Sequence, residues 1–158
     1  MKPPVNRKFI WLLSALTPCF AQSGAITVDY PANRSIFPPD IAAPTFLWRD
    51  AVESNRSWRI RVVFADGAGP LVLDSAGERM QIGKMDPRTI APSNKPPELT
   101  PQQAAAHTWK PDAATWETIR KHSVDRPATV KIEGISTSGG RMTSQGVVTI
   151  ETSPSNAP

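Results

Sequence analysis

Hydrophobic side chains recur at every second position over several short stretches of the chain. In one of them Trp58, Ile60, Val62 and Phe64 alternate with residues that are mostly polar. A period of two places the apolar side chains on one face of a β-strand. The same pattern predicts further strands at residues 26–30, 46–49, 71–75, 129–133 and 147–151.

Glycine-rich segments separate two pairs of these stretches. ADGAGP (65–70) precedes the strand LVLDS, and STSGG (136–140) lies between the last two strands. Glycines supply the positive φ angles that tight hairpin turns need. Several short strands with turns between them predict an all-β fold, an antiparallel β-sandwich.

The middle of the chain has a different character. Residues 86–103 (DPRTIAPSNKPPELTPQQ) contain five prolines, which predict a loop because proline cannot donate to a strand ladder. Residues 112–123 (DAATWETIRKHS) follow as one short helix inserted into the sandwich. Asp112 is a suitable N-cap, and Trp116 and Ile119 share a helix face.

The first 21 residues, MKPPVNRKFIWLLSALTPCFA, run from basic through apolar to small residues. This order is typical of a secretory signal peptide. We therefore expect a signal peptide at 1–21, a β-sandwich domain at 22–152 and a disordered tail at 153–158. The apolar run is shorter than the roughly 20 residues that span a bilayer, so we expect no integral membrane segment after cleavage.

The single cysteine, Cys19, lies within this leader. Lipid anchoring through Cys19 is an alternative to simple export, although Pro18 directly before it argues against a lipoprotein signal. Cleavage after Ala21 would leave a domain without disulfide or thiol chemistry. Export without disulfides indicates a bacterial envelope protein, periplasmic or extracellular.

The net charge of +4 suggests nucleic-acid binding until its distribution is considered. Lys2, Arg7 and Lys8 belong to the leader, and without them 15 basic side chains face 14 acidic ones. Binding to phosphates would need a concentrated basic patch, and the charges alternate instead. We expect no nucleic-acid partner.

The stretch from Tyr30 to Asp50, YPANRSIFPPDIAAPTFLWRD, combines four prolines with four large aromatic residues. Prolines keep a connection extended without offering an edge for pairing, and the aromatic side chains give it apolar groups to bury. We expect a stiff loop that closes one end of the sandwich, with Trp48 and Trp58 meeting in the core.

This stretch, followed by SWRIRVVF, resembles the immunoglobulin or fibronectin type III-like module of large exported bacterial proteins. In those proteins the module accompanies TolB-like propeller repeats or cytochrome c segments. The resemblance covers residues 25–64 well, and WKPDAATWETIRKHS and ATVKIEG less specifically. The sequence has no CxxCH haem-attachment motif and no propeller repeat, so the resemblance implies an accessory or docking role.

The sequence offers little catalytic chemistry. His107 and His122 lie in no recognisable motif, and we expect solvated or capping histidines. Metal-binding patterns are missing, and we expect no metal, no cofactor and no enzymatic activity. The carboxylates that could form a glycosidase pair are scattered along the chain. They are Asp40, Asp50, Glu53, Asp112 and Glu117.

Binding is the better functional hypothesis. Trp109 and Trp116 bracket WKPDAATW, which includes Asp112, and such a pair can present a flat platform to a sugar ring or to a partner's apolar side chain. The alternative is that they fasten the helix to the sandwich. We expect a non-catalytic binding or assembly module with a protein partner in the envelope. The alternatives are a carbohydrate-binding protein and a small accessory subunit of an envelope redox or propeller complex.

Overall fold

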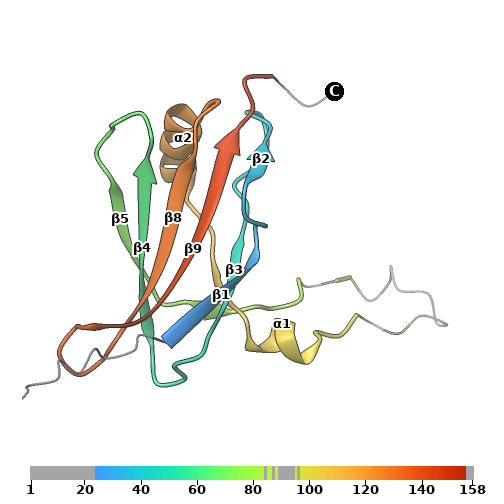
Figure 1. Cartoon of the computed structure of the whole chain (residues 1–158). Coiled ribbons are helices and arrows are strands. Elements are labelled where there is room, and N and C mark those ends of the chain that lie inside the picture. The colour runs from blue at the N-terminus through green and yellow to red at the C-terminus, as the bar shows by residue number, and fades with distance from the viewer. Residues whose placement is uncertain (1–23, 84, 87, 89–94, 96, 156–158) are drawn as a thin grey trace, which may run out of the picture.

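The computed structural model describes residues 24–83, 85, 86, 88, 95 and 97–155. The expected signal peptide, much of the proline-rich loop and the end of the expected tail lie outside these residues. The described part of the chain is mostly β, with 43% strand and 13% helix, and its mixed sheet is nearly closed into a barrel (Figure 1). The elements are β1 (Gly24–Tyr30), β2 (Ser35–Phe37), β3 (Phe46–Asp50), β4 (Ser57–Phe64), β5 (Leu71–Ser75), β6 (Glu78–Arg79), α1 (Pro101–Ala105), β7 (His107–Trp109), α2 (Ala113–His122), β8 (Ala128–Ile135) and β9 (Met142–Thr152).

The strands follow the order β5-β4-β8-β9-β1-β3-β7-β6, and β2 also pairs with β9. Both predicted hairpins form, β4 with β5 and β8 with β9. The prediction of a mostly β chain is confirmed. The pairing is mixed and not purely antiparallel as predicted, because β1 and β2 both run parallel to β9. Period-two alternation identifies strands but does not specify the direction of their neighbours.

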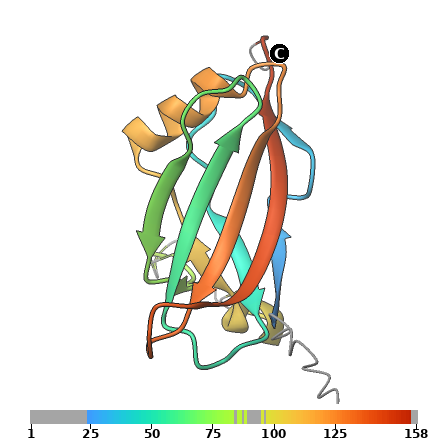
Figure 2. The same cartoon turned by 60° about the vertical axis from the view of Figure 1, so that its left-hand side comes forward.

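Two segments connect one side of the nearly closed sheet to the other. The first two residues of β1 pair with β9 and the rest pairs with β3, with a register shift between Val28 and Tyr30. On the other side β5 passes through Ala76 and Gly77 into β6, which pairs with β7. Figure 2 shows β5, β4, β8 and β9 side by side on one face. The barrel therefore bends at β1 and at Gly77.

The core lies between the strands and is formed by the alternating apolar residues that the sequence pattern identified. Ile60, Val62 and Ile132 are fully buried. Trp48 and Trp58 meet edge to face with ring centroids 5.8 Å apart, which confirms their predicted contact. Aromatic side chains of this size each bury about 150–250 Å², so this pair contributes much of the hydrophobic stabilisation.

Helix α2 is fastened to the proline-rich connection between β2 and β3. Asp112 caps its N-terminus by accepting from the Thr115 amide at 2.7 Å, as predicted. The Trp116 ring packs edge-on against Phe37, with centroids 5.7 Å apart, and its Nε1 donates to the Ile41 carbonyl at 3.1 Å. The end of β2 and the connection after it therefore provide the surface against which α2 packs.

The aromatic residues of the stretch 30–50 do not all share one role. Phe37, Phe46 and Trp48 are buried as predicted, whereas Tyr30 is 43% exposed. Tyr30 pairs with Leu47 beyond the register shift in β1. A bulge reorients the side chains that follow it, which explains why alternation misplaced this ring.

The prediction of a single helix is wrong, because α1 forms at the end of the segment predicted to be a loop. Thr100 and Gln103 make a reciprocal capping box, and Pro101 occupies the first turn. Proline is favoured at this position because the first amide of a helix has no intrahelical acceptor. Neither described helix is long and apolar enough to cross a membrane.

Replacing Gly77 by alanine tests the bend between β5 and β6. Gly77 has φ +57, and an added Cβ would lie 2.4 Å from the Trp58 ring. The left-handed conformation and the overpacking together should reduce the free energy of unfolding by at least about 2 kcal/mol. Chemical denaturation measures this change. Gly69→Ala is the matched control, because its added Cβ meets nothing within 4 Å. Equal effects of the two substitutions would contradict the assigned role of Gly77.

Candidate functional site

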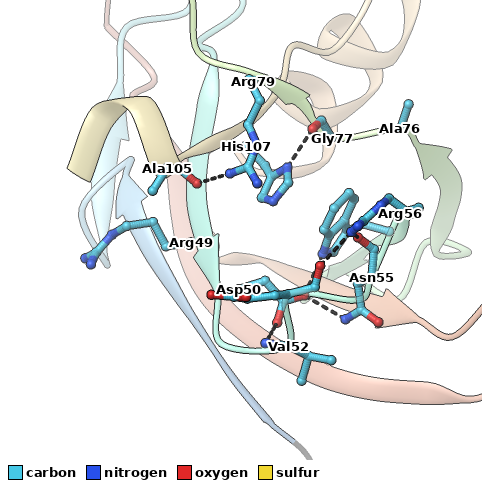
Figure 3. A pocket seen from close by; sticks show the side chains of 12 residues that line it. Arg49, Asp50, Val52, Asn55, Arg56, Ala76, Gly77, Arg79, Ala105 and His107 are labelled. Atoms are coloured by element: carbon cyan, nitrogen blue, oxygen red, sulfur yellow. Dashed lines mark hydrogen bonds between the residues drawn. The ribbon is translucent and has the colours of Figure 1, made fainter. Parts of the chain in front are cut away.

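An open pocket of about 520 Å³ lies at the end of the barrel away from α2. Three segments line it: the loop from β3 to β4, the bend from β5 to β6, and the junction of α1 with β7 (Figure 3). These segments are far apart in the sequence and meet because the barrel nearly closes here. The volume is within the range of small-ligand pockets, about 300–1,000 Å³.

The floor of the pocket is organised by the carboxylate of Asp50. Its Oδ1 accepts from the Val52 amide at 2.9 Å. Its Oδ2 accepts from Asn55 Nδ2 at 2.8 Å, Trp58 Nε1 at 2.9 Å and Ser144 Oγ at 2.8 Å. Hydrogen bonds to an ionised acceptor are stronger than neutral ones, so four of them hold this side chain in one orientation.

Asn55 extends this network along β9. Its Nδ2 also donates to Ser144 Oγ at 3.0 Å, and its Oδ1 accepts from Thr143 Oγ1 at 2.7 Å. Asn55 is 2% exposed and Ser144 is fully buried. A Cβ at Gly134 would lie 2.2 Å from both of their polar atoms, so β8 passes directly against the network. Buried polar groups of this kind are stable only when their hydrogen bonds are satisfied.

His107 forms part of the opposite wall. Its Nδ1 is 2.6 Å from the Gly77 carbonyl oxygen and donates to it, since a carbonyl can only accept. The ring lies 4.1 Å from Trp58 and 5.9 Å from Trp48, centroid to centroid. In the neutral ring Nε2 is therefore left as an acceptor. Figure 3 shows the imidazole between the β6 segment and the Asp50 side chain.

Burial lowers the pKa of His107 below its usual 6.5, because the charged ring would lose hydration. The bond to Gly77 raises the pKa, nearby Arg79 lowers it, Asp50 raises it and Arg56 lowers it. Burial outweighs the favourable contacts, and the ring is mainly neutral at pH 7.

Three arginines line the pocket, but their surroundings differ. Arg49 is paired with Asp29 through two hydrogen bonds of 2.8 and 2.7 Å, and it points away from His107 (Figure 3). Arg56 donates to carbonyls of its own loop, and Arg79 donates to the Ala105 carbonyl. Among the described residues, no carboxylate lies within ion-pair distance of Arg56 or Arg79.

The residues that the sequence proposed as a binding platform lie elsewhere. Trp116 is 4% exposed and belongs to the core, and Asp112 serves as the N-cap of α2. Trp109 is half-buried and packs on Phe46 with ring centroids 5.1 Å apart. Trp116 therefore cannot form one half of an exposed tryptophan pair, and the alternative of fastening the helix describes it better.

The other histidine lies at the far end of the molecule. His122 Nδ1 is 2.7 Å from Asp66 Oδ2, and its ring packs against Phe64. This contact joins the end of α2 to the turn after β4. A hydrolytic triad also requires a nucleophile next to the histidine. The described hydrogen bonds of His122 include none to a Ser, Thr or Cys side chain.

The sequence predicted a solvated or capping histidine at 107, but the ring is partly buried against Trp58. Asp50 was predicted only as one of several scattered carboxylates, and neither Asn55 nor Arg79 was predicted to belong to a site. No local motif joins them, because Asp50 and His107 are brought together by the pairing of β3 with β7. The segment DAVESN, which follows an apolar strand, could have indicated the role of Asp50. A carboxylate at a strand end often accepts hydrogen bonds from amides of the next turn.

Fold and site together define a mostly β protein with a polar pocket at one end of a nearly closed mixed sheet. In the described part of the chain, no group of three or more His, Cys, Asp or Glu side chains could hold a metal ion. Comparison of the chain with protein-family models, with curated proteins and with solved structures finds no match. The resemblance to the immunoglobulin or fibronectin type III-like module therefore stays a prediction.

The burial of His107 predicts a pH dependence. Because its folded pKa lies below 6.5, the unfolded chain takes up this proton first as pH falls. The contribution of His107 to stability should be complete above pH 6.5 and should be lost as pH drops through the folded pKa. NMR titration of the imidazole should give a midpoint below that of His107 in the peptide AAAHTWK. An equal or higher midpoint in the protein would contradict the assigned environment.

Proposed function

We propose that this chain is a non-catalytic binding or assembly module of the bacterial cell envelope, and that it recognises a protein partner through the pocket at the end of the barrel. One observation carries the proposal: the pocket combines a rigid floor at Asp50 with two arginines. These are Arg56 and Arg79, which have no described carboxylate partner. A fixed cavity with a few convergent polar groups is the usual form of a binding site.

Recognition is favoured over turnover by the way the polar groups are used. Asp50 accepts four hydrogen bonds from the protein, and His107 Nδ1 is committed to the Gly77 carbonyl. A general base needs a free position next to a nucleophile or water and a pKa matched to its task. Groups held this firmly in structural bonds are suited to shaping a pocket.

We also propose that the nearly closed sheet is a variant of the immunoglobulin or fibronectin type III-like sandwich. One layer would contain β5, β4, β8 and β9, and the other β1, β3, β7 and β6. The tryptophan pair Trp48 and Trp58 then lies between the layers. The bends at β1 and Gly77 would be the places where the two layers join.

Export to the envelope is part of the proposal and rests on the leader predicted at residues 1–21. A small accessory subunit of a larger envelope complex is a narrower form of the same function. A sugar platform at Trp109 and Trp116 has less support, because the Trp116 ring is buried.

Site-specific photo-crosslinking in cells of the source organism tests the function. A photo-reactive residue replaces Glu53, which is exposed and lines the pocket, in the full chain. We expect one discrete protein adduct in the envelope fraction. Ile36, which is 64% exposed on β2 at the other end of the barrel, is the matched control position and should give none. No adduct at position 53, or an adduct at position 36 alone, would contradict binding through this pocket.

A further inference from the structure

Two of the arginines that line the pocket, Arg56 and Arg79, are held in place by bonds that leave most of their donors unused. Arg56 Nη1 donates to the carbonyl oxygens of Glu53 and Asn55. Arg79 Nη1 donates to the Ala105 carbonyl at the end of α1. In the hydrogen bonds that the structure describes, Nε and Nη2 of both guanidinium groups take no part. Each group is therefore oriented in advance and can still bind a ligand through the rest of its planar edge.

The two arginines come from different walls of the pocket. Arg56 lies in the loop between β3 and β4, and Arg79 lies in β6 beyond the bend at Gly77. Both side chains line the pocket that also contains His107, so two positive charges act within one cavity. Arg49 does not add to this field, because Asp29 neutralises it.

The remaining charges in the lining limit what the arginines can bind. Asp50 and Glu53 contribute two carboxylates to the same pocket, equal in number to Arg56 and Arg79. A doubly charged phosphate would be repelled by these carboxylates, since like charges at short range destabilise each other. A group with a single negative charge can contact the guanidinium edges at a lower electrostatic cost, and a carboxylate matches their planar geometry.

We infer that the pocket binds a carboxylate of an acidic peptide segment of the partner, through Arg56 and Arg79, with His107 Nε2 accepting a hydrogen bond from the peptide. This inference rests on the proposed binding function and gives the chemical class of its ligand. The carboxylate belongs to an Asp or Glu side chain or to a peptide C-terminus, which share the same chemistry. A pocket of about 520 Å³ holds a side chain and the adjoining backbone, not a folded surface.

The inference is tested by titrating small probes into the wild-type protein and recording NMR spectra. Trp58 Nε1–H, bonded to Asp50, reports on the pocket, and Trp116 Nε1–H, bonded to Ile41, reports on the far end. The probes are acetyl-Gly-Glu-Gly-amide, acetyl-Gly-Gln-Gly with a free C-terminus, acetyl-Gly-Gln-Gly-amide and inorganic phosphate. We expect saturable shifts at Trp58 with a carboxylate-bearing probe only. The first two probes distinguish a side-chain from a terminal carboxylate.

Substitutions identify the residues responsible. Arg56→Gln and Arg79→Gln should each weaken binding of the carboxylate probe about tenfold, the equivalent of one charge-assisted hydrogen bond. Arg59→Gln is the matched control, because Arg59 pairs with Asp74 away from the pocket and should leave affinity unchanged. Raising the salt concentration should weaken binding in the wild type through screening.

Several results would overturn the inference. Equal shifts with the uncharged peptide, tighter binding of phosphate, or unchanged affinity in both arginine variants would each show that a carboxylate is not recognised. An adduct at position 53 without carboxylate binding would leave the binding function intact and refute only the ligand class. Carboxylate binding without any adduct would support the ligand class and refute a protein partner.

Discussion

The carboxylate of Asp50 is the interaction on which both the barrel end and the pocket depend. It joins the end of β3 to the next loop, to Trp58 at the start of β4 and to Ser144 in β9. Removing such an acceptor would leave several buried donors unsatisfied, each costing about 1–3 kcal/mol. The residue that defines the floor of the pocket is thus also the one that fixes how three strands meet.

The pocket wall opposite Asp50 is formed by the bend at Gly77 and the His107 ring bonded to it. Its positive φ carries the chain from β5 to β6, and its carbonyl accepts from His107. Absence of a Cβ lets the Trp58 ring pack directly against this backbone. The same indole therefore bonds to Asp50 on one side and supports the Gly77 bend and the His107 ring on the other. Arg56 and Arg79, which we propose recognise the ligand, line the pocket that these contacts frame.

Local signals in the sequence predicted much of the fold. Alternation identified the strand containing Trp58 and Ile60, and Asp112 correctly marked the start of α2, because both patterns depend only on neighbouring residues. The parallel pairing of β1 and β2 with β9 could not be predicted in this way, since it depends on how the whole sheet closes. The pocket was missed for the same reason. Asp50 and His107 are 57 residues apart and become neighbours only through strand pairing.

A double-mutant cycle between Asp50→Asn and Ser144→Ala tests the central claim most directly. If the carboxylate holds β9 through a buried, charge-assisted hydrogen bond, the free energies of unfolding should show a coupling of about 1–3 kcal/mol. The exposed pair of Arg59 and Asp74, treated in the same way, should show less than about 1 kcal/mol. Additive effects of Asp50→Asn and Ser144→Ala would contradict the claim that Asp50 joins the strands around the pocket.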